Sequence, residues 1–307
     1  MRARPARWAL AILACLVCGV AQPVHAWRAT VIDVIELPAA WRAHELSGLA
    51  WVPPESALMA VSDRGWLWRL PVRIEVEAGI ERLRLRPVAE PVRLPVGANG
   101  ARPNAESLAW RAPNELVIAD ERQQQALVVD TAGRFLRWQA LPGPGGMHQS
   151  VRGANHGVEA MTVHPVHGLL AAPQRPPKGA DPAEHLVHAT HGGPWRLPAT
   201  PATPATPGGR SALKAMELLD PVTLLVLERV GSGKAMQAVL RPMRLAACVA
   251  PKACDTPALR LQHERLAGRD NFEGLACPKP DRCLVVSDDG GRGPASRTML
   301  LLVGIER

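Results

Sequence analysis

The chain has 307 residues, and 47% of them are hydrophobic, which is enough to build a sizeable core. Its formal net charge of +8 comes mostly from arginines scattered along the sequence. No basic run with interleaved aromatic residues accompanies this charge, so it indicates a solvated basic surface and does not predict nucleic-acid binding.

The first 26 residues have the pattern of a secretory signal peptide. Three arginines precede the apolar stretch 8–21, and Ala26 ends a small-residue cleavage site. The apolar stretch is short for a membrane-spanning helix, so cleavage is favoured over retention as an anchor. We therefore expect a mature chain of residues 27–307, located in the periplasm or secreted, with no membrane span.

The mature chain keeps four cysteines, arranged as two pairs that are each six positions apart: Cys248 and Cys254, and Cys277 and Cys283. In an exported protein this spacing predicts two local disulfides, Cys248–Cys254 and Cys277–Cys283, each closing a turn. A zinc site is the alternative, but the spacing is not that of paired CxxC ligands.

Five segments of the chain repeat one pattern: a key residue, an apolar pair, a turn, a second apolar run and a polar end. The key residues are Ser47, Glu106, Glu159, Lys214 and Glu273, which lie 53 to 59 residues apart. Each unit has the alternation and turn residues of about four short strands. In the second unit the expected strands are 107–110, 116–119, 126–130 and 135–141.

This period predicts an all-β protein, a β-propeller with five blades of about four strands each. Six blades is the alternative, if one long unit contains a degenerate blade. The residues before the first key position and after the last add up to one more period. A strand at 30–37 should therefore complete the blade that begins at Glu273 and continues at 298–305. The propeller forms one domain, with a Pro/Ala/Thr low-complexity loop at 197–209.

In a propeller the innermost strands surround a central axis, so the key residues of different units should meet there. The candidate catalytic residues are Glu106, Glu159 and Glu273, with His156 as a further general acid or base. An acid followed by arginine ends the second strand of three units, which gives these candidate substrate-binding residues: Asp63, Arg64, Arg122, Glu228 and Arg229. These pairs could instead be salt bridges between blades.

Carboxylates that converge repel one another unless a cation joins them. Oxygen ligands from carboxylates and amides are the kind that Ca²⁺ prefers. The sequence therefore predicts a calcium site, with these candidate ligands: Asn155, Asn271, Asp288 and Asp289.

Several stretches resemble the exported "phytase-like" or "esterase-like activity of phytase" family, in the order in which that family has them. They are residues 45–51, 61–65, 105–109, 155–160, 224–229, 270–276 and 286–289. The resemblance implies an exported β-propeller that is a hydrolase or a binding protein and uses calcium.

The leading hypothesis is an exported, monomeric propeller hydrolase that acts on a small ester or phosphoester at one end of the axis. One alternative is a non-enzymatic periplasmic binding or scaffold propeller. Another is a calcium-dependent lactonase, since gluconolactonase-type propellers also place Glu, Asn and Asp around one metal. The hydrolase and lactonase hypotheses require the carboxylates near the axis to take part in catalysis, and the scaffold hypothesis does not.

Overall fold

The computed structural model describes most of the chain beyond the predicted signal peptide. The described residues are 26–97, 100–143, 147, 157–177, 179–201, 211–231, 236–248, 254, 256–266, 271–290 and 297–307. No helix within these ranges is long and apolar enough to cross a membrane. The described helical segments are short 3₁₀ turns, such as η1 (Ala39–Trp41), η2 (Pro53–Glu55) and η5 (Leu245–Ala247).

The described strands form five antiparallel sheets of four strands, which are the blades of a β-propeller. Blade 1 contains β2 (Leu46–Val52), β3 (Ala57–Ser62), β4 (Trp66–Leu70) and β7 (Val92–Arg93). Blade 2 contains β8 (Ala105–Arg111), β9 (Glu115–Asp120), β10 (Gln125–Asp130) and β11 (Phe135–Ala140). Blade 3 contains β12 (Val158–His164), β13 (Gly168–Pro173), β14 (Glu184–Ala189) and β15 (Trp195–Pro198).

Blade 4 contains β16 (Ala212–Asp220), β17 (Thr223–Val230), β18 (Gln237–Arg244) and β19 (Leu259–Arg260). Blade 5 contains β20 (Asn271–Lys279), β21 (Arg282–Asp288), β22 (Met299–Glu306) and β1 (Arg28–Glu36). The inner strands β2, β8, β12, β16 and β20 each contact the next one, and β20 returns to β2, so they close a ring. The five-blade prediction is therefore confirmed.

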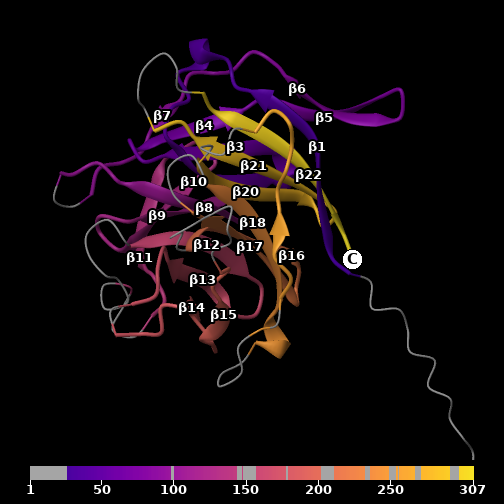
Figure 1. The fold of residues 1–307 in the computed structure, drawn as a ribbon. Coiled ribbons are helices and arrows are strands. Elements are labelled where there is room, and N and C mark those ends of the chain that lie inside the picture. Colours follow the sequence, from indigo (N-terminus) through magenta and orange to yellow (C-terminus); the bar gives the residue numbers. More distant parts are fainter. Residues whose placement is uncertain are drawn as a thin grey trace, which may run out of the picture.

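The two ends of the chain close this ring, as the sequence predicted. Strand β1 pairs antiparallel with β22 from Arg28 opposite Glu306 to Glu36 opposite Met299. Figure 1 shows the indigo β1 running beside the yellow β22. This pairing supplies the outer strand of blade 5 and ties the N-terminal part of the sheet to the C-terminal part.

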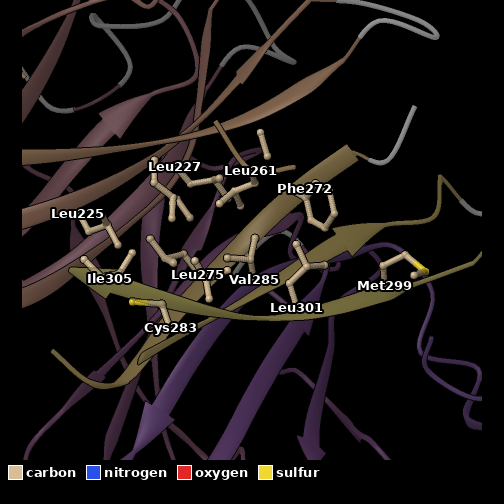
Figure 2. Packing of buried hydrophobic residues seen from close by; sticks show 14 of the residues in the cluster. Leu225, Leu227, Leu261, Phe272, Leu275, Cys283, Val285, Met299, Leu301 and Ile305 are labelled. Carbon is tan, nitrogen blue, oxygen red and sulfur yellow. The ribbon is translucent and has the colours of Figure 1, made fainter. Parts of the chain in front are cut away.

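Apolar side chains fill the spaces between neighbouring blades. Second strands such as β9 and β17 are nearly continuous apolar runs because both faces of each blade are covered. Between blades 4 and 5, for example, Leu227 of β17 packs with Leu275 of β20 and Val285 of β21. Figure 2 shows these side chains pointing into one cluster. Each fully buried leucine contributes about 1.5–3 kcal/mol, so these clusters hold adjacent blades in register.

Blade 1 carries an extra hairpin that the sequence pattern did not reveal. Strands β5 (Val72–Glu77) and β6 (Ile80–Leu85) pair only with each other and are inserted between β4 and β7. The hairpin extends from the side of the propeller in Figure 1. Its Leu83 is buried beside β1, where the backbone N–H of Leu83 donates to Asp33 at 2.8 Å. This insertion explains the long first repeat and braces the closing strand.

Both predicted disulfides are present. Cys277–Cys283 joins β20 to β21 across their turn, as expected. Cys248–Cys254 lies instead in the long connection between β18 and β19. The backbones of these two cysteines hydrogen-bond to that of Arg196 in β15, so this disulfide holds blade 4 against blade 3.

Replacing both Cys277 and Cys283 with alanine is expected to lower the free energy of unfolding by roughly 2–3 kcal/mol, because a short cross-link restricts the unfolded chain. Urea denaturation of the oxidised wild type and the double variant would measure this difference. Equal midpoints would contradict it. Reduced wild type serves as the control, since it also lacks the second disulfide and should be less stable than the variant.

Candidate functional site at the axis mouth

The inner strand of every blade has a break in pairing register at the same place. The residue that the register skips is Ser47 in β2, Glu106 in β8, Glu159 in β12, Lys214 in β16 and Glu273 in β20. A β-bulge of this kind turns one side chain away from the regular alternation of the strand. We call these five residues the first ring and the end of the axis where they lie the axis mouth.

A second ring comes from the ends of the second strands. The residues opposite the start of each bulge are Ser62, Asp120, Pro173, Glu228 and Ser287. The next residues along the chain make up the second ring: Asp63, Glu121, Gln174, Arg229 and Asp288. The acid-then-arginine pattern in the sequence predicted that Glu228 would occupy the position that Asp63 has in blade 1. The observed register places Arg229 at this position, because Glu228 is the residue that pairs with Leu213 at the start of the bulge.

Lys214 connects two glutamates of the first ring across three blades. Its ammonium contacts Oε2 of Glu159 and lies 2.8 Å from Oε1 of Glu273. The three side chains are only 3%, 6% and 8% exposed, respectively. Burial raises the pKa of Glu159 to about 7, although Lys214 opposes this rise. Burial alone would lower the pKa of Lys214, but the two carboxylates raise it above its usual value.

Further donors from the second ring and from Asn271 hold these glutamates. Gln174 donates to Oε1 of Glu159 at 2.6 Å. Asn271 donates to Oε1 of Glu273 at 2.7 Å and to Oδ2 of Asp288 at 3.2 Å. Arg229 contacts Asn271 and lies 3.4 Å from Glu273. The structure therefore brings together most of the predicted site residues of blades 3, 4 and 5.

Glu106 differs from the other glutamates of the first ring. Its side chain is partly exposed, and no hydrogen bond or ion pair to it is found within the described ranges. Burial raises the pKa of Glu106 well above its usual value, and the negative charges of Glu159 and Glu273 add to this effect. Glu106 is thus a carboxylic acid that holds its proton at higher pH than an ordinary glutamate, yet still reaches solvent.

Two aspartates of the second ring, Asp63 of blade 1 and Asp288 of blade 5, also have raised pKa values. Burial raises the pKa of Asp63 to about 7, with further contributions from Asp288 and Glu273. Burial and the charge of Glu273 raise the pKa of Asp288 to about 6. Oδ1 of Asp63 is buried and has no hydrogen-bond partner among the described residues. Asp289 points elsewhere, to His44 at 2.5 Å and to the backbone N–H of Glu45.

Glu121 belongs to the second ring, although it was not among the candidate site residues predicted from the sequence. Its carboxylate accepts hydrogen bonds from Asn104 at 2.8 Å and from the backbone N–H of Gly157 at 2.9 Å. It therefore joins blade 2 to blade 3. The signal in the sequence was the position of Glu121 after the second strand, which it shares with Asp63.

Other predicted site residues lie apart from this group. Glu228 is fully buried between blades, where it pairs with Arg241 at 3.4 Å and contacts Thr200. Arg64 is 56% exposed and contacts Glu45, while Arg122 is exposed and donates to the backbone of Arg102. The two predictions in the Gly-rich loop, Asn155 and His156, lie outside the described residues.

The described side chains do not fit the calcium site that the sequence suggested. Among them, no three His, Cys, Asp or Glu groups are placed to hold one metal ion. Asn271 and Asp288 bond to each other, and Asp289 is turned to His44. The place between Glu159 and Glu273 holds the ammonium of Lys214. We therefore derive no chemical step that uses a metal.

A carboxyl outside both rings, that of Glu217, also has a raised pKa. Glu217 of β16 follows Lys214 by three positions, between the apolar residues Ala215 and Leu219 that pack toward blade 5. Burial raises the pKa of Glu217 to about 8, opposed by the backbone N–H of Leu218. No cationic side chain in the described part of the chain pairs with it.

Replacing Glu217 with glutamine is expected to stabilise the protein at pH 8 but not at pH 4. The folded-state pKa is raised, so the wild type loses stability as the pH rises from about 4.5 to about 8, and the variant does not. The gain at pH 8 should be at least about 1.4 kcal/mol, the equivalent of one pKa unit. Thermal melts across this range would measure it, with the exposed Glu90→Gln as control. A pH-independent difference would contradict the expectation.

Comparisons with known proteins identify a family and several similar solved structures. A family model described as "Phytase-like: Esterase-like activity of phytase" matches residues 42–291. No curated protein matches the chain. One similar solved structure is that of the RRP9 WD40 repeats, with 9% identity, a TM-score of 0.44, and coverage of 91% of this chain and 99% of that one. Another is the PQQ-bound aldose sugar dehydrogenase from Streptomyces coelicolor, with 14% identity, a TM-score of 0.44, and coverage of 91% and 98%.

Proposed function

Since the chain belongs to the phytase-like family, we propose that it is an ester hydrolase whose active site is the axis mouth. The observation that carries this proposal is Glu106, a partly exposed carboxyl with a raised pKa and no partner in the described part of the chain. A carboxyl that keeps its proton near neutral pH is suited to general acid catalysis. Perturbed pKa values gathered at one place also favour a functional site.

In the proposed reaction, water attacks the carbonyl carbon of the ester and gives one proton to a carboxylate base. Asp63 is the candidate base, because its Oδ1 is buried without a partner and its pKa is about 7. The bond between the carbonyl carbon and the alcohol oxygen breaks, and Glu106 donates its proton to the departing oxygen. Arg229, partly exposed beside Glu273, is placed to stabilise negative charge on the carbonyl oxygen.

The charges of the axis mouth favour an uncharged ester over a phosphoester. The two rings contain six carboxyl groups, from Glu106, Glu159, Glu273, Asp63, Glu121 and Asp288. Only two cations, Lys214 and Arg229, accompany them in these rings, and both contact Glu273. A phosphate group would meet net repulsion there. We therefore propose carboxylic esters and lactones as the substrate class, with phosphoesters as the second choice.

The purified mature protein would be assayed with p-nitrophenyl esters, a p-nitrophenyl phosphate and a lactone. We expect turnover of a carboxylic ester or lactone that exceeds turnover of the phosphate. No turnover of any of them would contradict the proposal.

The second candidate is a binding propeller without catalysis. The buried network of Glu159, Lys214 and Glu273 favours it, because networks of this kind also serve as structural links between blades. It predicts that charge-neutralising substitutions in the rings change the melting temperature and nothing else. The same substrate panel separates the two candidates.

We also propose that the protein works outside the cytoplasm. Its two disulfides support this location, since such bonds persist mainly in oxidising compartments. Cell fractionation with N-terminal sequencing tests it. A mature N-terminus near Trp27 in the periplasm or medium is expected, and an intact cytoplasmic chain would contradict the proposal.

A further inference from the structure

The position of Lys214 in the first ring suggests a role beyond that of one more salt bridge. In the other four blades the bulge presents serine or glutamate, and only blade 4 presents a cation. The ammonium lies between carboxylates from the blades on either side of its own, Glu159 of blade 3 and Glu273 of blade 5. A divalent cation that neutralised these two carboxylates would have to occupy the same place.

We propose that Lys214 is a built-in cation that takes the place of a metal ion at the axis mouth and positions Glu159 and Glu273 without one. It is a positioning residue, because it contacts these glutamates and its side chain is almost fully buried. This inference does not depend on the proposed hydrolysis, since it concerns how the carboxylates are held together.

The hydrogen bonds around Lys214 support this role. Oε1 of Glu159 accepts from Gln174, and its Oε2 contacts the ammonium. Oε1 of Glu273 accepts from Asn271 and faces both Lys214 and Arg229. Donors from the chain thus take up both carboxylate oxygens of Glu159 and Oε1 of Glu273, which would otherwise be available to ligate a metal.

Electrostatics agree with the geometry. Lys214 lowers the pKa of Glu159 and of Glu106 against the effect of burial. Without this charge, three carboxyls of the first ring would lie together with only Arg229 nearby among the ring residues. When the ammonium is removed, the uncompensated carboxylates should therefore bind a cation that prefers oxygen ligands.

The test compares wild type with Lys214→Ala, which removes the ammonium and leaves room for an ion. Thermal melts are recorded in EDTA and in millimolar calcium chloride. We expect no calcium effect on the wild type and a rise of roughly 5 °C for Lys214→Ala, because an ion that binds only the folded state stabilises it. Lys214→Arg, which keeps a cation, and Lys279→Ala, which removes an exposed lysine, should show no calcium effect.

A further variant locates the ion. In Lys214→Ala, adding Glu159→Gln should abolish the calcium effect. A calcium effect that survives this change would overturn the proposal, as would a Lys214→Ala protein that ignores calcium. The wild type gives a result that does not depend on whether Lys214→Ala folds. If calcium stabilises the wild type and this effect is lost in Glu159→Gln, a metal ion binds beside Lys214 and the inference is overturned. Because every readout is a melting temperature, an absence of hydrolytic activity would not affect this test.

Discussion

Replacing Glu106 with glutamine is expected to lower kcat on any ester that the protein hydrolyses by roughly 100- to 10,000-fold, the usual contribution of a general acid. Glutamine keeps the shape of the protonated side chain but has no acidic proton to give to the departing alcohol. Burial and the charges of Glu159 and Glu273 raise the pKa of Glu106 well above its usual value, so the fold favours the neutral carboxyl that glutamine resembles. The variant should therefore keep its melting temperature at pH 7.

Steady-state kinetics and thermal melts on the same preparations would check this prediction. The exposed Glu264→Gln is the matched control and should leave both kcat and the melting temperature unchanged. A Glu106→Gln protein with wild-type kcat would remove Glu106 from the mechanism. A protein that loses activity and stability together would favour the structural interpretation of the first ring.

Replacing Lys214 with methionine is expected to lower the free energy of unfolding by about 3–5 kcal/mol, the usual cost of removing one partner of a buried ion pair. Methionine fills most of the lysine volume, so the loss measures charge and not packing. Glu159 and Glu273 would then remain buried without the cation between them.

The loss should grow with pH. In the wild type, Lys214 opposes the rise in the pKa of Glu159. Without it, the folded-state pKa of Glu159 rises further above the unfolded value, and stability present at low pH is lost as the pH rises through that folded-state pKa. Chemical denaturation at pH 5 and pH 8 would measure this. A variant equally destabilised at both pH values would contradict the electrostatic explanation.

A second substitution isolates the pair. In the double variant Lys214→Met with Glu159→Gln, one charge of each sign is gone, so it should be more stable than Lys214→Met alone at pH 8. The exposed Lys279→Met should have no effect beyond a few tenths of a kcal/mol.

The repeat in the sequence was sufficient to predict the propeller, because each unit must place the same apolar runs in the same strands. The ring closure followed from the remaining lengths at the two ends, and β1 does pair with β22. The hairpin of β5 and β6 was missed, because its alternation of apolar and charged residues is the same as that of an outer blade strand. Only tertiary pairing distinguishes an insertion from a blade strand.

The site could be predicted as a set of residues but not as a set of contacts. The first ring was found because the key position is fixed within each repeat. The second ring was shifted in blade 4, since sequence similarity matched Glu228 with Asp63, whereas strand pairing places Arg229 there and buries Glu228 beside Arg241. The pairing of Lys214 with two glutamates depends on the closed ring, so no local pattern could reveal it.

The most direct test of the proposed acid is the pH dependence of kcat/KM on an uncharged p-nitrophenyl ester. If Glu106 must be protonated, kcat/KM of the wild type will fall as the pH rises through a pKa well above 4.5, and this descending limb will be absent in Glu106→Gln. A wild-type rate that rises steadily with pH, or a descending limb that persists in Glu106→Gln, would contradict the assignment of Glu106 as the general acid of the axis mouth.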